Sequence, residues 1–209
     1  MDLTSFRQNY SKGELLENSV NPHPVEQFKI WLNQAIEAKM YEPNAMTLST
    51  IHGNRVSSRI VLLKKIGEGF TFFSNYHSKK GKDLHENPLA SLLFYWPEME
   101  RQVRIEGMIV KIAQFDSEKY FHSRPIASQI GAIVSQQSAI INSRKELEEE
   151  FESLKNKYEG KTIPKPGHWG GYELIPNYFE FWQGRRSRLH DRIAYEKIKG
   201  EWDIHRLAP

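Results

Sequence analysis

Three clusters of basic and hydroxyl-bearing residues have the composition that binds phosphate groups without a glycine-rich loop. Each cluster lies at a strand end or a helix start of the predicted elements. The clusters are Arg59 with Lys64, then Ser74 with Lys79 and Lys80, and finally Tyr120 with Arg124 and Ser128. One such cluster is typical of an ordinary surface, but three in one small chain predict ligands that together carry two phosphates.

The first and third clusters have informative spacing. Arg59 and Lys64 flank the apolar run Ile60–Leu63, which predicts a buried strand. Because side chains alternate along a strand, Arg59 and Lys64 are predicted to face opposite sides and to serve two different anions. Arg124 ends one predicted helix and Ser128 lies in the first turn of the next, where the helix dipole favours an anion.

Other reaction chemistries lack their motifs. Gly160-Lys161-Thr162 resembles the end of a phosphate-binding loop, but Lys155 stands where the first glycine of that loop is required. Gly67 and Gly69 lead into a predicted strand and lack the third glycine of a dinucleotide fingerprint. The chain has no Cys, and its eight His residues show no metal-ligand spacing. Thiolate and metal chemistry are therefore not predicted, and no metal ligand is assigned.

The predicted elements describe an arm followed by one domain. Residues 1–22 contain few apolar anchors, which predicts a flexible N-terminal arm that can act as a lid over a single domain of residues 23–209. A helix is predicted to begin at Pro24 and to end at 41–44. The hydrophobic period then changes to two, which predicts strands at 45–51, 55–65, 70–75, 89–96 and 102–113 and a short helix within 77–87. Five strands in about 70 residues, mostly in meander order, favour a small antiparallel barrel.

The second half adds helices and further strands. Asp116 or Ser117 is predicted to cap a helix that ends at His122, and Pro125 starts the next one. Ser143 begins a capping box before a helix whose apolar face consists of Leu147, Phe151, Leu154 and Tyr158. Strands predicted at 169–174, 178–183, 188–197 and 201–207 could complete the barrel. The predicted fold class is therefore mainly β with helices.

The composition excludes several protein classes. The 209-residue chain has a formal net charge of +3, too small a surplus to indicate a nucleic-acid partner. None of its apolar runs approaches the ~18 residues of a membrane span, and its start does not resemble a secretory signal. Because a cysteine-free chain fits a reducing compartment, we predict a cytoplasmic protein. Five Trp, nine Tyr and eleven Phe are enough to fill a core and also to line a pocket for a flat ligand.

The sequence resembles the pyridoxine (pyridoxamine) 5′-phosphate oxidase family from about Arg7 to its last residue. The resemblance is carried, in the same order, by Arg59–Lys64, Glu100–Val103, Tyr120–Pro125, Ser128–Gly131, Ser135–Ser138, His168–Gly171, Glu180–Gly184, Arg188–Arg192 and Arg206–Pro209. It implies the FMN-binding split-barrel fold and a homodimer with the flavin sites at the subunit interface.

The resemblance also implies the ligand contacts. Those to FMN would come from Arg59, Ile60, Val61, Leu62, Leu63, Lys64, Phe73, Ser74, Lys79, Lys80, Gln102, Gln137, Ser138, Trp182 and Arg192. Those to the substrate would come from Arg7, Tyr10, Lys64, Tyr120, Arg124, Ser128, Arg188 and His190. Within that set, Arg188 and His190 would lie near the reacting carbon and have the catalytic role.

The implied reaction oxidises pyridoxamine 5′-phosphate or pyridoxine 5′-phosphate to pyridoxal 5′-phosphate. A hydride passes to flavin N5, and O₂ reoxidises the flavin to give H₂O₂. Three features depart from the family pattern: Gln8 where a second basic residue is common, Lys79 where an arginine is common, and the pair Arg185-Arg186 in a loop that is usually richer in glycine. These departures concern lid closure, FMN phosphate affinity and substrate access.

Two alternatives remain open from the sequence. A split-barrel protein that binds flavin without catalysis would share the phosphate-binding clusters, although Arg188 and His190 favour an enzyme. A single-stranded nucleic-acid binder could use the basic and aromatic residues for stacking. The small net charge and the lack of a basic stripe disfavour it.

Overall fold

The computed structural model describes residues 1–209, which form nine strands, five α-helices and two 3₁₀ turns. In chain order these are α1 Pro24–Glu37, β1 Ala45–His52, β2 Arg55–Leu62, β3 Lys65–Ile66, β4 Phe70–Asn75, α2 Lys79–Glu86, β5 Leu89–Trp96, η1 Pro97–Met99, β6 Arg101–Lys111, α3 Gln114–Ser123, α4 Ile126–Val134, α5 Arg144–Lys157, β7 Trp169–Gln183, η2 Arg186–Arg188, β8 Asp191–Ile198 and β9 Glu201–Arg206. Most element bounds lie within a few residues of the prediction.

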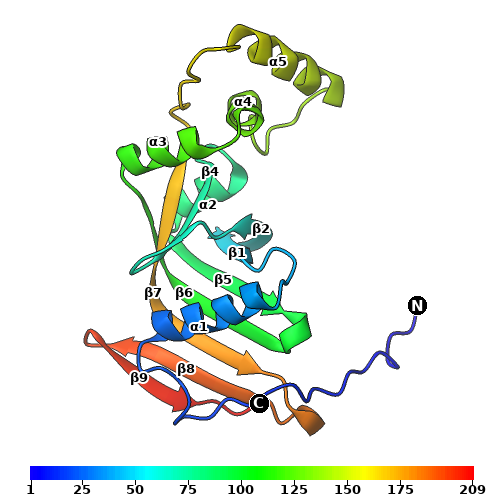
Figure 1. Cartoon of the computed structure of the whole chain (residues 1–209), viewed down its shortest axis with the longest axis vertical. Helices are drawn as coiled ribbons and strands as arrows, with labels where there is room; N and C mark the ends of the chain where they lie inside the picture. Colours follow the sequence, from blue (N-terminus) through cyan, green and yellow to red (C-terminus); the bar gives the residue numbers. More distant parts are fainter.

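All nine strands belong to one antiparallel sheet with the order β2-β1-β5-β6-β7-β4-β3, and β8 and β9 continue from β7. The 15-residue strand β7 joins the two ends of the molecule (Figure 1). Its first half pairs with β4, its second half pairs with β8, and β6 runs beside almost all of it. The hydrogen-bonded path ends at β2 and β3, so the ladder is not closed. The predicted meander order is wrong, because β6 and β7 separate β5 from β4.

Two hydrophobic clusters both include residues of this long strand. The larger cluster contains 23 buried residues, among them Phe28 and Trp31 of α1, which pack against rings of the sheet. The smaller cluster joins Phe121, Ile130 and Trp169 under the helices α3, α4 and α5. As predicted, the apolar face of α5 packs against this second cluster, which attaches the helical lobe to the start of β7 (Figure 1).

Strand β2 is an edge strand and not the buried strand that its apolar run predicted. It lies at one end of the sheet, and the side chain of Ile60 is 64% exposed. The strand also ends at Leu62, earlier than predicted, because the backbone N–H of Lys64 instead donates to the carbonyl of Thr71 at 2.8 Å. The sequence pattern did not predict the edge position, because an apolar run does not show whether the strand has a neighbour on both sides.

The two strands predicted at 169–174 and 178–183 form one strand. A β-bulge in β7 lies opposite Glu106 and Gly107 of β6: Asn177 has no partner there, and the ladder continues past Pro176. Glycine is required on β6 at this bulge, because a Cβ atom at Gly107 would collide with the carbonyl oxygen of Ile175. The bulge therefore lets one strand run through the region that the pattern divides into two.

Of the two predicted helix N-caps, that of α5 forms and that of α3 does not. The Ser143 hydroxyl accepts from the backbone N–H of Glu146 at 3.2 Å, as the capping box predicted. Helix α3 begins at Gln114 after Ala113, without a side-chain cap, so the cap predicted at Asp116 or Ser117 is wrong. The hydroxyl of Ser117 instead accepts from the N–H of Gly171 at 3.1 Å, which ties α3 to β7.

The C-terminal half of the arm is packed against the domain. Leu15 is buried in the larger cluster, and the carboxylate of Glu100 accepts from the backbone N–H groups of Ser11 and Lys12 at 2.7 and 2.9 Å. The first residues are exposed and extend away from the body of the molecule (Figure 1). That the arm moves as a lid stays a prediction.

Replacing Glu100 is expected to release the arm. Glu100→Ala removes two hydrogen bonds to a charged acceptor, each worth about 1.5–3 kcal/mol. Trypsin cleavage after Lys12 should therefore become at least about 10-fold faster, as measured by limited proteolysis. Glu98→Ala is the matched control, because only the backbone carbonyl of Glu98 contacts the arm. Equal cleavage rates in the two variants would contradict this anchoring role.

None of the α-helices combines the length and the apolar character needed to cross a membrane. No group of three or more His, Cys, Asp or Glu residues is arranged to hold a metal ion.

Candidate active site

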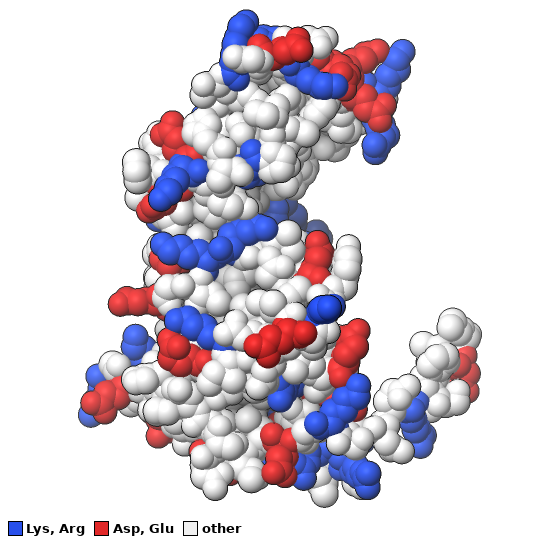
Figure 2. Space-filling view, viewed as in Figure 1, with Lys and Arg blue, Asp and Glu red and all other residues white.

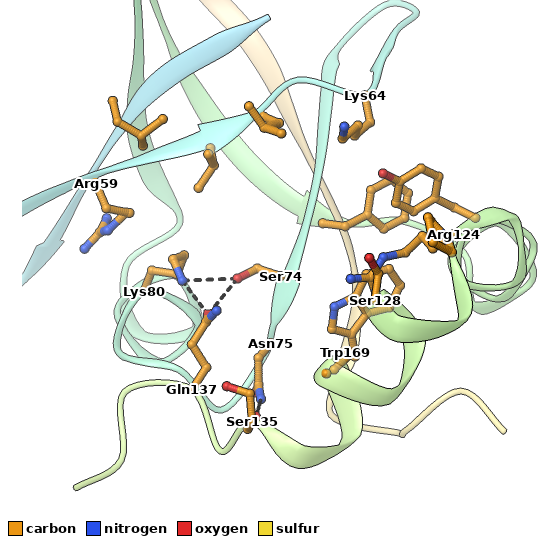
Figure 3. A pocket seen from close by; sticks show the side chains of 18 residues that line it. Arg59, Lys64, Ser74, Asn75, Lys80, Arg124, Ser128, Ser135, Gln137 and Trp169 are labelled. Atoms are coloured by element: carbon orange, nitrogen blue, oxygen red, sulfur yellow. Dashed lines mark hydrogen bonds between the residues drawn. The ribbon is translucent and has the colours of Figure 1, made fainter. Parts of the chain in front are cut away.

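A cavity of about 670 Å³ lies between the edge of the sheet and the helices α3 and α4 (Figure 3). Its volume is in the usual range for small-molecule sites. It contains members of all three predicted phosphate-binding clusters. The predicted site residues that line it are Arg59, Ile60, Val61, Leu62, Lys64, Phe73, Ser74, Lys80, Tyr120, Arg124, Ser128 and Gln137.

One side of the cavity holds a three-residue polar cradle. The ammonium group of Lys80 donates to Gln137 Oε1 at 2.6 Å and to the hydroxyl of Ser74 at 3.2 Å. That hydroxyl in turn donates to the same Gln137 oxygen at 3.2 Å (Figure 3). All hydrogen-bond partners of Lys80 are neutral oxygens, and it lies at the N-terminal end of α2. A cation with neutral partners at a helix N-terminus fits a phosphate group.

The pKa of Lys80 is lowered to about 8, mainly by burial and also by the positive charge of Arg59, while the carboxylate of Asp83 partly opposes this. An anion bound in the cradle would stabilise the charged form. Phosphate affinity is therefore expected to be constant below pH 8 and to fall above it, where the free protein has lost the proton of Lys80.

A pH series of FMN dissociation constants measures this effect. In the wild type, the Kd should rise by up to about 10-fold per pH unit above pH 8. Lys80→Arg is the control, because a guanidinium stays protonated throughout this range, and its Kd should show no alkaline rise. An equal alkaline rise in both proteins would assign the effect to another group.

The buried carboxylate of Asp83 organises the cations next to this cradle. It accepts from the hydroxyl of Thr50 at 2.8 Å and from the ammonium group of Lys79 at 3.0 Å. Arg59 donates to the same hydroxyl at 2.8 Å and lies 3.7 Å from the carboxylate. These contacts hold Arg59 on the cradle side of the cavity, whereas Lys64 lies at the opposite end (Figure 3). Arg59 and Lys64 thus line one cavity, so the prediction that they face opposite sides is wrong.

The other side of the cavity contains a second cation without an acidic partner. Arg124 Nη1 is buried and has no hydrogen-bond partner. Its guanidinium lies 4.8 Å from the ring centre of Trp169, and burial lowers the pKa of Arg124. The hydroxyl-bearing side chain of Ser128 lies nearby, in the first turn of α4 (Figure 3). A guanidinium that lines a cavity and has no acidic partner can bind an anion there by charge-assisted hydrogen bonds.

Stacked aromatic rings form the wall behind this second cation. Tyr120 stacks on Phe73 with ring centres 3.8 Å apart, and Phe73 stacks on Trp169 at 5.4 Å. Trp169 was not singled out from the sequence as a site residue, although it belongs to the His168–Gly171 stretch. Asn75, Pro125, Gly131, Ala132 and Ser135 also line the cavity and were not predicted.

A second group of predicted residues lies beyond the other end of β7. A cavity of about 680 Å³ is lined there by Arg7, Tyr10, Arg188 and His190. His190 Nδ1 accepts from the backbone N–H of Arg185 at 3.1 Å, which leaves the proton of the neutral ring on Nε2. Burial lowers the pKa of His190, the charge of Arg188 lowers it further, and Asp191 opposes this. The imidazole is thus neutral near pH 7.

The turn that carries Arg188 has an uncommon backbone. Ser187 and Arg188 have φ angles of 57° and 60°, in the left-handed region that side chains other than glycine rarely adopt. Conformations of this kind cost of order 1–3 kcal/mol and cluster at functional sites. They give Arg188 an exposed position at the rim of the second cavity.

The register of the sheet aligns three further predicted residues. Gln102 of β6 is paired with Trp182 of β7, and Trp182 is paired with Arg192 of β8, so the three form a row across the sheet. The indole of Trp182 lies 4.7 Å from the ring of His190, which joins this row to the second cavity. Arg192 Nε donates to Glu180 at 2.9 Å.

The first half of the chain matches the family model "Pyridoxamine 5′-phosphate oxidase" over residues 32–158. Residues 169–209 match the model "Pyridoxine 5′-phosphate oxidase C-terminal dimerisation region". The chain belongs to the pyridoxamine 5′-phosphate oxidase family.

Curated relatives of this family match the whole chain. A pyridoxine/pyridoxamine 5′-phosphate oxidase of Cytophaga hutchinsonii is 52% identical, with 100% of this chain and 99% of the relative covered. One of Gloeothece citriformis is 49% identical, with 99% and 98% covered. The chloroplastic oxidase 1 of Arabidopsis thaliana is 53% identical over 100% of this chain, which spans 41% of that longer protein.

Solved structures confirm the predicted fold class. PhzG from Burkholderia lata, in complex with tetrahydrophenazine-1-carboxylic acid, superposes with a TM-score of 0.89 at 30% identity and covers 95% of this chain and 100% of its own. A related FMN-binding protein from Nostoc punctiforme has a TM-score of 0.71 at 15% identity, covers 91% of this chain and 100% of its own, and supports the fold alone.

Within this oxidase-family fold, the predicted site residues are divided between distant places. The first cavity borders Trp169 at the start of β7, whereas Arg188 follows its end. Fifteen residues of strand span up to about 45 Å. Six predicted residues line neither of these two cavities. Gln102, Trp182 and Arg192 form the row across the sheet, and Leu63 is buried in the core. Lys79 and Ser138 line a neighbouring pocket together with Gln137.

Charged side chains of both signs are mixed over the face shown in Figure 2, where no continuous basic stripe is visible. Lys80 and Arg124 of the first cavity differ from most of these surface cations because neither forms a salt bridge.

Proposed function

We propose that this protein oxidises pyridoxamine 5′-phosphate and pyridoxine 5′-phosphate to pyridoxal 5′-phosphate with FMN as cofactor. The observation that carries the proposal is the pair of anion positions in one cavity, the Lys80 cradle and the unpartnered Arg124. Two phosphorylated ligands held side by side need such a pair. The full-length curated relatives named as oxidases of these two substrates support the choice.

The residues around the cradle fit the phosphate of FMN. Lys80, Ser74 and Gln137 supply its donors, with Lys79 and Ser138 next to them and Arg59 behind. The exposed Ile60 of the edge strand offers apolar surface against which a flat ring system can lie. Val61, Leu62 and Phe73 continue this surface along the cavity.

The opposite side of the cavity fits the phosphate of the substrate. Arg124 and Ser128 would donate hydrogen bonds to this phosphate, and Tyr120 and Lys64 line the same cavity. Because burial has already removed part of the hydration of the Arg124 guanidinium, less hydration is lost when it binds an anion, and this favours phosphorylated over unphosphorylated substrates.

A homodimer completes the site. Arg188 and His190 lie too far along β7 to reach the cavity of their own chain, so in this proposal they serve the cavity of the partner protomer. Gln102, Trp182 and Arg192 would flank the flavin from the same side. The match of residues 169–209 to a dimerisation region supports this arrangement.

FMN held by Lys80, Ser74 and Gln137 would supply the two-electron oxidation of the substrate carbon, with O₂ as the final electron acceptor. The protein positions that carbon: the two phosphate sites set the register of the stacked rings, and closure of the arm through Arg7 and Tyr10 excludes water. Arg188 orients the substrate by charge, because a guanidinium with a pKa above ~12 is a poor proton acceptor. Neutral His190 can accept a hydrogen bond only through Nδ1, which is occupied, so it donates to the substrate through Nε2.

Absorption spectroscopy and an oxygen electrode test the proposal. The purified or FMN-titrated protein should be yellow and should consume O₂ with pyridoxamine 5′-phosphate while pyridoxal 5′-phosphate forms. A colourless protein that gains no FMN overturns the proposal. A yellow protein without turnover would instead support the non-catalytic flavin-binding alternative. The cytoplasmic location stays a prediction, which cell fractionation can test.

A further inference from the structure

Arg124 is held in place by an aromatic side chain to which neither the family motifs nor the phosphate-binding clusters assigned a role. We propose that Trp169 is a positioning residue for recognition of the substrate phosphate: its indole face holds the guanidinium of Arg124 in one place at the wall of the cavity. This inference rests on the proposed function, because it deepens the role given there to Arg124.

The first observation is the contact itself. The guanidinium carbon of Arg124 lies 4.8 Å from the indole centre, within cation–π range, whereas the nearest other ring, that of Phe121, is 6.0 Å away. Nη1 is buried and unpaired, so no protein oxygen fixes its direction. The indole face is thus the principal contact that orients this cation.

The second observation is that the indole itself is immobilised. It stacks on Phe73 at an interplanar angle of 14° and meets the edge of Phe121 at 67°. Its backbone is paired with Asn75 of β4 in the sheet register. A ring fixed on two sides by aromatic neighbours and through its backbone by the sheet gives the guanidinium a rigid surface.

The third observation concerns the backbone of Arg124. This residue ends α3 in an extended conformation, with φ −77° and ψ 152°, as expected before Pro125. The long side chain starts from a defined direction but has several rotatable bonds beyond it. Contact with Trp169 selects one of the resulting orientations, which lowers the entropy cost of binding an anion.

Kinetics of the holoenzyme test the role of Trp169. Trp169→Leu is expected to raise the KM for pyridoxamine 5′-phosphate about 10-fold, with kcat and the FMN Kd within twofold of the wild type. Trp169→Phe, which keeps a smaller π face, should raise it about threefold. The KM for unphosphorylated pyridoxamine should not change, and the Kd of inorganic phosphate for the holoenzyme, measured by calorimetry, should rise in parallel.

A double-mutant cycle with Arg124→Ala separates positioning from a structural role. In that background, Trp169→Leu should raise the KM no further, because the group that it positions is absent. Ile163→Ala is the packing control, since Ile163 belongs to the same buried cluster and should leave the KM unchanged. If Trp169→Leu does not fold, Trp169→Phe carries the same cycle.

The outcomes are distinct. An unchanged KM, an undiminished effect in the Arg124→Ala background, or an equal rise in Ile163→Ala overturns the inference. A wild-type protein that does not oxidise pyridoxamine 5′-phosphate contradicts the proposed function instead. In that case the calorimetric comparison of inorganic phosphate binding still tests the contact between Trp169 and Arg124.

Discussion

Arg188→Ala is expected to leave the protein yellow and to lower kcat by about 10²–10³-fold, the usual effect of removing one preorganised charge from a reacting centre. Arg188 lies at the rim of the second cavity, beside His190 and far from the FMN phosphate cradle. The residue is exposed, and its backbone has a φ angle of 60°. Its loss should therefore affect the reacting carbon and not the retention of the cofactor.

Steady-state kinetics together with the flavin content per protomer measure this effect. Arg186→Ala is the matched control, because Arg186 is an exposed arginine of the same turn that does not line the cavity of Arg188. It should keep turnover within about twofold. Arg188→Lys, which keeps the charge but loses the planar fork, should fall between the two. Unchanged turnover in Arg188→Ala would refute the assigned role, and loss of flavin would move Arg188 to the cofactor site.

Arg124→Ala has the second large expected effect. It removes a charge-assisted donor worth about 1.5–3 kcal/mol, which corresponds to a rise of about 10–150-fold in the KM for pyridoxamine 5′-phosphate. The FMN Kd should stay the same, because FMN phosphate is held at the Lys80 cradle on the opposite side of the cavity.

Comparison with unphosphorylated pyridoxamine makes this prediction specific. Its kcat/KM should be similar in the wild type and in Arg124→Ala, so the preference for the phosphorylated substrate should collapse. Lys119→Ala, an exposed position of the same helix α3, controls for general loss of positive charge. Loss of FMN in place of a higher KM would mean that the two phosphate sites are interchanged.

The predictions from sequence succeeded where the information was local. Period-two alternation located β4 and β5 with the bounds they have in the structure, and Ser143 capped its helix as predicted. The predictions failed where the position or length of a strand depended on its pairing with strands distant in the sequence. The run Ile60–Leu63 is apolar, but no pattern shows that its strand lies at the edge of the sheet. Likewise, no local pattern shows that β7 continues through a bulge at Asn177, opposite Glu106 and Gly107 of β6.

For the candidate site too, the sequence predicted the residue types but not the contacts between distant residues. The residue types that can hold phosphates were visible in the sequence, and so was their association with a family. The contact between Lys80 and Gln137 was not, because it joins residues 57 positions apart through the packing of α4 against β4. Trp169 lacked a local signal for its contact with Arg124 for the same reason.

The sequence by itself determined the strand-rich fold class, the family and the set of anion-binding side chains, because each follows from residue types at short spacing. The tertiary structure decided which of those side chains share a cavity and which do not. It placed Lys80 and Arg124 on facing sides of one cavity, and it placed Arg188 beyond the other end of the 15-residue strand β7. Such distances are set by strand order and register, which arise from long-range pairing and not from neighbours along the chain.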